Sequence, residues 1–314
     1  MPYEFKIDDE YSGISPKNFL KKKLDISYNQ IFIHIKNKRI TINGKKIKND
    51  MKMKKGDIIK VWLDSIPKRE EIETVLDRIE PKNLGMKTIF ENKDFLVLNK
   101  LSGVVVQGAP DNESSLSYHL EFLRRKNKDK TQYFHVHRLD KETSGVLICS
   151  KDMASRRILN EVFKKKDMKK VYVCLCEGKF TKKSGKVECK LDRTPPETRE
   201  KVVVSDIGKD SLSLYKVINE FNFEGEKLSL VEVEIKTGIT HQIRVHMKSL
   251  GHPIVGDRMY GNSYINNKFK RLLDRQFLHA KEIDFEYEGK KYSFKADYTD
   301  DLNDVLRVLK KTKS

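Results

Sequence analysis

Four strand-like segments follow one another between residues 171 and 235, and no helical pattern separates them. They are residues 171–175, 202–204, 212–217 and 228–235, all rich in β-branched or aromatic residues. A parallel sheet needs a long crossover between successive strands, usually a helix, whereas strands joined more directly pair antiparallel. These segments therefore predict an antiparallel sheet.

The segments before residue 170 mix helices and strands without the strict alternation of a parallel α/β protein. Apolar and β-branched runs predict strands at residues 95–98, 104–106 and 145–149. Helices are predicted at residues 116–125 and 152–165, and the apolar side of the second contains Ile158, Leu159, Val162 and Phe163. The whole pattern predicts the α+β class, with a large, mixed and mostly antiparallel sheet flanked by helices.

Positive charge is concentrated near the N-terminus. The 314-residue chain has a formal net charge of +18, and residues 17–55 hold thirteen Lys or Arg against only Asp25 and Asp50. A solvated, lysine-rich face is the plain explanation of such an excess. Its concentration in one short segment with its own apolar pattern favours a module that binds a polyanion, with nucleic acid as the first candidate.

That basic segment has the organisation of a small α/β domain. Apolar residues at helical spacing predict two short helices between residues 19 and 35, and Asn43-Gly44 predicts a hairpin turn that a further strand follows. An acidic stretch with Pro67 and Pro81 then predicts a linker. We therefore expect a small basic domain at residues 1–64, a linker at 65–86 and a larger domain at 87–314.

The order of these elements at residues 13–63 resembles the RNA-binding domain first seen in ribosomal protein S-four. The resemblance implies that RNA is the partner of this domain. The basic side chains expected to contact RNA are Lys21, Lys22, Lys36, Lys38, Arg39, Lys45 and Lys46.

One segment of the larger domain, residues 137–145, has an unusual density of reactive side chains. It reads His-Arg-Leu-Asp-Lys-Glu-Thr-Ser-Gly and lies between two apolar strands. It does not match a protein-kinase catalytic loop, because a leucine separates Arg138 from Asp140 and no Asp-Phe-Gly follows. It does not match an aspartic-protease loop, because Glu142 stands where aspartate is required. An ordinary capped turn stays open on these residues alone.

The same segment resembles the signature of the RluA family of pseudouridine synthases. Further matches follow in the family's order, and they are residues 87–91, 95–100, 170–172, 237–246, 251–261 and 277–280. The resemblance spans about residues 87–297. The chain departs from the family pattern at Leu101, where proline is usual, and at Ile239, where arginine is usual. The second departure bears on RNA contacts more than on chemistry.

The resemblance implies the pseudouridine synthase fold and an isomerase that converts uridine in RNA to pseudouridine without a cofactor. The glycosidic bond is cut, the uracil rotates within the site, and a carbon–carbon bond forms. Asp140 would be the essential carboxylate, either as a nucleophile on the ribosyl carbon or as the base of a glycal-forming elimination. Burial beneath a base disfavours a charged carboxylate, and a permanent cation offsets this effect. Arg244 has that role by resemblance.

The remaining predicted site residues would bind the substrate. Tyr172 would stack on the target uracil or transfer a proton, although core packing is the default for a strand tyrosine. Arg138 would fill the RNA stack where the target nucleotide has left. Substrate contacts are also expected from His137, from Lys100 through a phosphate, and from Thr240, one helical turn before Arg244.

Neither metal nor redox chemistry is predicted. The spacing of Cys174 and Cys176 differs from the Cys-x-x-Cys pattern, and His137, His241 and His246 lack a suitably spaced further ligand. Four cysteines without a secretory signal indicate a reducing cytoplasm. No apolar stretch approaches the roughly 18 residues of a membrane span, and a monomer is the default expectation.

Three functions stay open at this level. The chain could be a pseudouridine synthase acting on ribosomal RNA, preferentially of the large subunit, or one acting on transfer RNA. It could also be a ribosome-associated RNA-binding protein that has lost catalysis, which only Ile239 favours. Retention of Asp140, Tyr172 and Arg244 argues against that third reading, because a pure binder has no need of an acid that faces phosphates.

Overall fold

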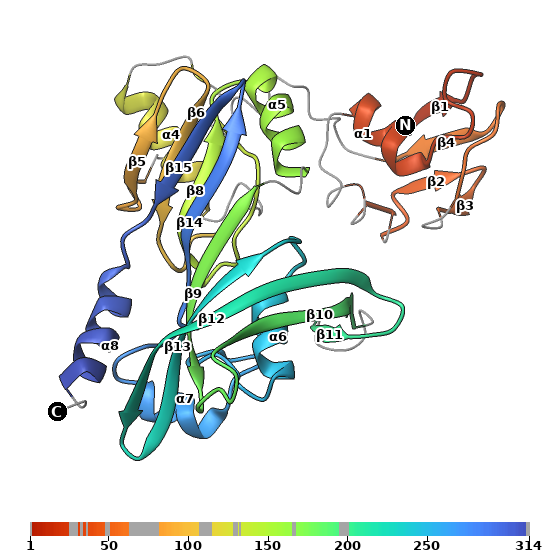
Figure 1. The fold of residues 1–314 in the computed structure, drawn as a ribbon. Coiled ribbons are helices and arrows are strands. Elements are labelled where there is room, and N and C mark those ends of the chain that lie inside the picture. The colour runs from red at the N-terminus through yellow and green to blue at the C-terminus, as the bar shows by residue number, and fades with distance from the viewer. Residues whose placement is uncertain are drawn as a thin grey trace. The chain divides into compact units, whose positions relative to one another are not determined.

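The structure is a computed structural model with two compact units, Met1–Glu80 and Pro81–Ser314 (Figure 1). The predicted domain boundary at residue 64 and most of the predicted linker lie outside the residues that the structure describes. The described residues are 2–24, 31, 34–35, 37–47, 51–62, 82–106, 115–127, 131, 133–164, 168–194 and 201–311.

The first unit contains a four-stranded antiparallel sheet of order β1-β4-β2-β3. The predicted hairpin is confirmed, since Asn43 and Gly44 have positive φ angles of 49° and 73°, as a type I′ turn requires. The first predicted helix is confirmed as α1, and the second, up to residue 35, lies mostly outside the described residues. The elements are β1 (Tyr3–Lys6), α1 (Pro16–Leu24), β2 (Ile40–Ile42), β3 (Lys45–Lys46) and β4 (Ile58–Val61).

One 11-stranded sheet organises the second unit. Its main path is β11-β10-β12-β13-β9-β14-β8-β6-β5, while β15 pairs with β14 and β7 with β8. Among the described strands of this sheet, only β14 and β8 pair in parallel. The predicted α+β class with a mostly antiparallel sheet is therefore confirmed.

The bounds of these elements show how much of the unit is strand. The strands are β5 (Lys87–Glu91), β6 (Phe95–Lys100), β7 (Phe134–His135), β8 (Ser144–Ser150), β9 (Lys169–Glu177), β10 (Ser184–Arg193), β11 (Val202–Val204), β12 (Lys209–Phe223), β13 (Glu226–Ile235), β14 (Leu278–Tyr287) and β15 (Lys290–Lys295). The helices are α4 (Leu116–Lys126), α5 (Met153–Lys164), α6 (Gln242–Ser249), α7 (Ser263–Phe269) and α8 (Asp300–Lys311).

Helices cover both faces of the sheet around β6. Side chains alternate between the two faces of a strand, so Phe95 packs in a cluster with Leu159 of α5, while Leu96 packs in another with Leu120 of α4. A strand that is buried on both faces needs no polar positions. This explains why residues 95–98 form an uninterrupted apolar run.

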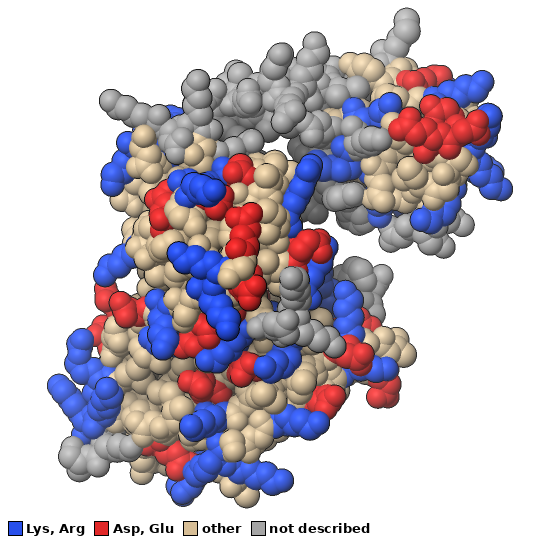
Figure 2. Space-filling view, turned by 45° about the horizontal axis from the view of Figure 1, so that its top comes forward, with Lys and Arg blue, Asp and Glu red and all other residues tan. Residues whose placement is uncertain are grey.

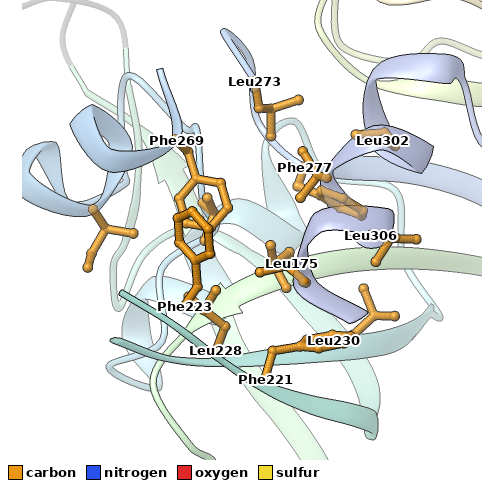
Figure 3. Close-up of a cluster of buried hydrophobic side chains, with 14 of the residues drawn as sticks. Leu175, Phe221, Phe223, Leu228, Leu230, Phe269, Leu273, Phe277, Leu302 and Leu306 are labelled. Carbon is orange, nitrogen blue, oxygen red and sulfur yellow. The ribbon is translucent and has the colours of Figure 1, made fainter. Parts of the chain in front are cut away.

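The sheet around β9 and β13 is also covered on both faces. Figure 3 shows one face, where Leu302 and Leu306 of α8 pack with Phe221 of β12 and with Phe269 of α7. The opposite face lies against α6, whose Ile243 is buried in a separate cluster. Burial on this side fixes the orientation of α6 and hence of the polar residues on its other side.

Two details of the predicted elements are wrong. Residues 104–106 form no strand, because their only ladder contact is an isolated bridge between Val105 and Ser115. Ile158 is 37% exposed and does not belong to the buried side of α5, which uses Leu159 and Val162. The other predicted strands and helices of this unit are present, most of them with longer bounds.

The parallel contact between β8 and β14 brings the two backbones unusually close. His279 pairs with Ser144 and Ala280 with Gly145. A Cβ atom on Gly145 would lie 2.2 Å from the Ala280 carbonyl oxygen, and Gly145 has a φ of 115°, which other residues rarely adopt. Only glycine fits here, directly after the loop that contains Asp140.

Candidate active site

The loop before β8 presents one basic and one acidic side chain to an open cavity. Arg138 and Asp140 line it together with Tyr172 of β9 and with Thr240 and Arg244 near the start of α6. The cavity has a volume of about 560 Å³, part of it open to solvent. Five of the predicted site residues therefore meet in one place, although they are up to 106 positions apart in the sequence.

Lys100 supports this loop from the protein interior. Its side chain is fully buried, and Nζ donates hydrogen bonds to the carbonyl oxygens of Leu101 at 2.8 Å and Lys141 at 3.0 Å. Burial, aided by the charge of Arg275, lowers the pKa of Lys100 to about 7, against the opposing effect of nearby acids that include Asp140. The predicted phosphate contact is wrong, because two backbone carbonyls hold this lysine away from the surface.

Arg275 supports the next part of the same loop. Its guanidinium, 2% exposed, donates to the Glu142 carbonyl oxygen at 3.1 Å and to Ser144 Oγ at 3.3 Å. Its Nε donates to Asp301 of α8 at 2.6 Å. The loop that carries Asp140 is thus fixed by a buried arginine whose counter-charge lies in the last helix.

Arg244 bridges two aspartates. Its Nε and Nη2 donate to the two oxygens of Asp257 at 2.7 and 2.9 Å, and its Nη1 donates to Asp140 Oδ2 at 3.2 Å. The guanidinium carbon lies 4.9 Å from the ring centroid of Tyr260, within the range of a cation–π contact. The bidentate pair and the ring fix the plane of the guanidinium, so that Nη1 is directed at Asp140.

Arg244 and Asp257 each favour the charged form of the other. Burial opposes ionisation of Asp257, but the hydrogen bonds and charge of Arg244, with the backbone N–H groups of Tyr260 and Met259, lower its pKa below the ordinary value. Burial likewise opposes the charge of Arg244, yet its pKa is raised by Asp257 and Asp140. Arg244 therefore stays a permanent cation beside Asp140.

Tyr172 lies half-buried in β9, between the β13 and β14 strands that pair with it. Burial raises the pKa of its phenol well above 10, and the charge of Asp140 raises it further. The phenol is therefore neutral near neutral pH. It can offer a ring face or an O–H group to a molecule in the cavity, but not a phenolate.

His137 and Thr240 differ from their predicted placement. His137 does not line the cavity; its Nε2 accepts a hydrogen bond from the Ile148 N–H at 2.9 Å, its ring stacks on Phe163, and burial lowers its pKa to about 3. Thr240 lines the cavity but precedes α6, because His241 adopts a left-handed φ of 57° and the helix begins only at Gln242. The prediction of Thr240 on the helix is wrong.

The basic residues of the first unit are mostly exposed. Lys38, Arg39, Lys45 and Lys46 are exposed, and Lys21 is half-buried. Lys36 and the side chain of Lys22 lie outside what the structure describes. Figure 2 shows that Lys and Arg are interspersed with Asp and Glu over the visible face of the second unit.

Metal and membrane features are lacking in the described part of the chain. There, no group of three His, Cys, Asp or Glu is placed to hold a metal ion. Cys174 and Cys176 are both buried in β9 with their sulfur atoms 3.6 Å apart. Among the described helices, none has the length and apolar character needed to cross a bilayer.

Sequence reasoning did not identify Asp257 and Tyr260 as functional, although both lie in the matched segment 251–261. A signal was present, since a buried arginine needs a buried counter-charge.

Ile239, at the position where arginine is usual in the resembled family, packs in an apolar cluster with Leu191 and Val245 and also lines the cavity. Its packing explains why this apolar residue is stable at the cavity wall.

Comparison with known proteins places this arrangement in a family. A model of the RNA pseudouridylate synthase family matches residues 94–249, which include Asp140, Tyr172 and Arg244. "Uncharacterized RNA pseudouridine synthase YhcT" of Bacillus subtilis is 32% identical over 287 residues, covering 89% of this chain and 87% of that protein. "Ribosomal large subunit pseudouridine synthase C" of Vibrio parahaemolyticus is 33% identical over 290 residues, covering 90% and 87%.

A solved structure agrees on the fold. The structure of "Human RNA Pseudouridylate Synthase Domain Containing 1" has a TM-score of 0.56 at 23% identity and covers 72% of this chain and 94% of its own. The sequence relatives extend over nearly the whole chain at more than 30% identity, and among the curated proteins it matches are large-subunit synthases named C and D. From these likenesses we conclude that the chain belongs to the RluA-type RNA pseudouridine synthases and is an isomerase.

Proposed function

We propose that this enzyme isomerises specific uridines of large-subunit ribosomal RNA and that Asp140 is its nucleophile. The observation that carries the proposal is the contact between Asp140 Oδ2 and Arg244 Nη1, 3.2 Å apart, in the wall of the cavity. Asp140 is the one acid among the described residues that line it. An adjacent permanent cation keeps a partly buried carboxylate charged, and a nucleophile must be charged.

The proposed reaction balances without a cofactor. One oxygen of Asp140 forms a bond to C1′ of the ribose while the C1′–N1 bond breaks, and the electron pair of that bond leaves with the uracil. After the uracil rotates, C5 bonds to C1′ and the ester bond breaks, which returns its electron pair to the carboxylate. A proton leaves C5 and N1 gains one. A carbon–carbon bond thus replaces a carbon–nitrogen bond.

The neighbouring side chains support this reaction. Tyr172 offers a neutral ring face, on which a base stacks with about 1–3 kcal/mol. Arg138 is exposed at the rim, where a planar cation can replace the stacking that the flipped nucleotide has given up. Flipping a nucleotide out of an RNA helix costs a few kcal/mol. The contacts of Tyr172 and Arg138 offset this cost and so favour the flipped-out nucleotide.

The names of the relatives support the proposed substrate class. Several are called ribosomal large subunit pseudouridine synthase C or D, and each aligns with more than four fifths of this chain. No observation in the described cavity favours transfer RNA over ribosomal RNA.

Pseudouridine mapping tests this substrate class. RNA from a strain that lacks this gene should have unmodified uridines at one or more positions of large-subunit ribosomal RNA, and expression of the wild-type chain should restore them. Loss confined to transfer RNA would replace the proposed substrate with the alternative. Unchanged modification of both RNAs would contradict the proposed function.

We also propose that residues 1–64 form an RNA-binding domain. Lys38, Arg39, Lys45 and Lys46 are exposed on or beside the short strands β2 and β3, in a segment with little compensating negative charge. Exposed cations that neutralise phosphates release counterions, which makes affinity depend on salt.

The double substitution Lys45→Gln with Lys46→Gln should therefore weaken RNA binding and flatten its salt dependence. The slope of log affinity against log salt should fall by about one for each phosphate that the variant no longer neutralises. Filter binding at several salt concentrations measures it. Lys290→Gln with Lys291→Gln is the matched control, since this pair is also exposed at the start of a strand that follows a turn. Equal effects of the two substitutions would contradict a specific role of the first domain.

A further inference from the structure

His241 has a left-handed backbone conformation, which is uncommon for a residue other than glycine. It precedes α6 with φ 57° and ψ 14°, and its side chain makes no capping hydrogen bond to the helix. A non-glycine residue in the left-handed region is strained unless its surroundings hold it there, and such residues cluster at functional sites. The side chain of His241 lines the cavity, with Nε2 3.8 Å from Asp140 Oδ2.

The hydrogen bonds around Tyr260 favour one tautomer of His241. The Val202 N–H donates to the Tyr260 hydroxyl oxygen at 2.8 Å. His241 Nδ1 lies 3.0 Å from that same oxygen. The described residues offer the Tyr260 O–H no other acceptor that the hydrogen bonds show, which favours donation from this hydroxyl to Nδ1. A neutral His241 then carries its hydrogen on Nε2, the nitrogen that faces Asp140.

Two donors consequently face the same oxygen of Asp140. Arg244 Nη1 lies 3.2 Å from Oδ2 and His241 Nε2 lies 3.8 Å from it. The second distance exceeds a hydrogen bond, and contacts of this kind often tighten when substrate closes a site. Within the described residues, the polar contacts of this carboxylate all fall on Oδ2, so Oδ1 is the oxygen left to react.

We infer that His241 is a positioning residue, whose neutral Nε2–H holds Oδ2 of Asp140 together with Arg244 and leaves Oδ1 to meet C1′ of the ribose. The inference rests on the proposed function, in which Asp140 is the nucleophile. Tyr260 selects the tautomer, and the left-handed backbone of residue 241 directs the ring to the carboxylate.

Burial keeps His241 neutral near neutral pH, and the charged groups around it act in both directions. Burial lowers its pKa below 6.5; Asp140 and Asp257 oppose this effect, while Arg244 and Arg138 add to it. Acidification therefore protonates Nδ1 only below the ordinary value, and the Tyr260 hydroxyl then loses its acceptor. A decline of the turnover rate that begins below about pH 6.5 is expected from this group.

Two amide substitutions separate the hydrogen-bond role from the backbone role. Glutamine can place an amide N–H near the position of Nε2, whereas asparagine reaches only about as far as Nδ1. Asparagine is the residue that tolerates a left-handed backbone better. His241→Gln should therefore be the more active variant if the Nε2–H matters, and His241→Asn if only the backbone conformation matters.

The test is the single-turnover rate at saturating RNA, followed as tritium release from RNA labelled at C5 of uridine. His241→Gln should stay within about 3-fold of the wild-type rate, and His241→Asn should lose about 10-fold or more. RNA affinity should be unchanged in both. The acid decline of the wild type should be reduced in His241→Gln, which has no ring to protonate.

Equal rates for the two variants, or a faster His241→Asn, would overturn the inference. So would an acid decline that is the same in His241→Gln and in the wild type. A wild-type protein that forms no pseudouridine, or an Asp140→Asn variant that forms it at the wild-type rate, would instead overturn the proposed function itself.

Discussion

The Asp140→Asn variant is expected to lose about 10³-fold or more of the rate of pseudouridine formation while its fold and RNA affinity stay intact. The amide has the shape of the carboxylate but no negative charge, so it cannot form the ester with ribose. Arg244 keeps Asp257 as its bidentate partner when Asp140 is replaced by a neutral residue. The fold should therefore tolerate the change.

Tritium release and direct pseudouridine mapping measure this loss, with circular dichroism and RNA binding as checks on the fold. Asp274→Asn is the matched control, since the side chain of Asp274 is 84% exposed and does not line the cavity. It should keep the wild-type rate. Pseudouridine formation by Asp140→Asn at a comparable rate would show that the carboxylate charge is not required.

Asp257→Asn should lower the free energy of unfolding more than any of the other substitutions. Asp257 is fully buried and pairs with Arg244, which is 7% exposed. Breaking a buried ion pair by removing one charge costs about 3–5 kcal/mol, because the other charge stays buried without compensation. Asp140 still contacts Nη1, so we expect a loss of about 3 kcal/mol in the free energy of unfolding, at the lower end of that range, together with lower activity from a less well oriented Arg244.

Urea unfolding at neutral pH measures the expected loss, and its pH dependence has a definite sign. The pKa of Asp257 is lowered in the folded state, so its contribution is complete above the unfolded value of about 3.9 and decreases as pH falls below it. The difference between wild type and variant should therefore be constant near neutral pH and shrink in acid. Asp274→Asn, which breaks only an exposed contact with Arg258 at 3.9 Å, should leave stability unchanged. Similar stabilities of the two variants would contradict a structural role for the buried pair.

Local patterns predicted those parts of the molecule that local physics determines. The Asn43-Gly44 turn, the buried run at residues 95–98 and the consecutive strands after residue 170 each depend on near neighbours or on a simple period. Asp140, Tyr172 and Arg244 were found because their motifs resemble those of a family. They share one cavity, and their catalytic roles stay proposals.

Long-range contacts explain what the sequence did not reveal. Lys100 ends a strand, and its hydrogen bond to the carbonyl of Lys141, 41 positions away, helps to make it a buried support rather than a surface cation. Residues 104–106 have the composition of a strand but lack a partner strand. His137 faces the β8 backbone, while Arg138 next to it faces the solvent. None of these outcomes depends on the residue type alone.

The pairing of Arg275 with Asp301 has a consequence for the order in which the enzyme matures. Arg275 holds the Glu142 carbonyl, 133 positions earlier in the chain, and its own counter-charge comes 26 positions later, in α8. During translation the loop that contains Asp140 is therefore complete long before Arg275 and Asp301 have been synthesised. This loop therefore reaches its fixed conformation only after α8 has docked on Arg275.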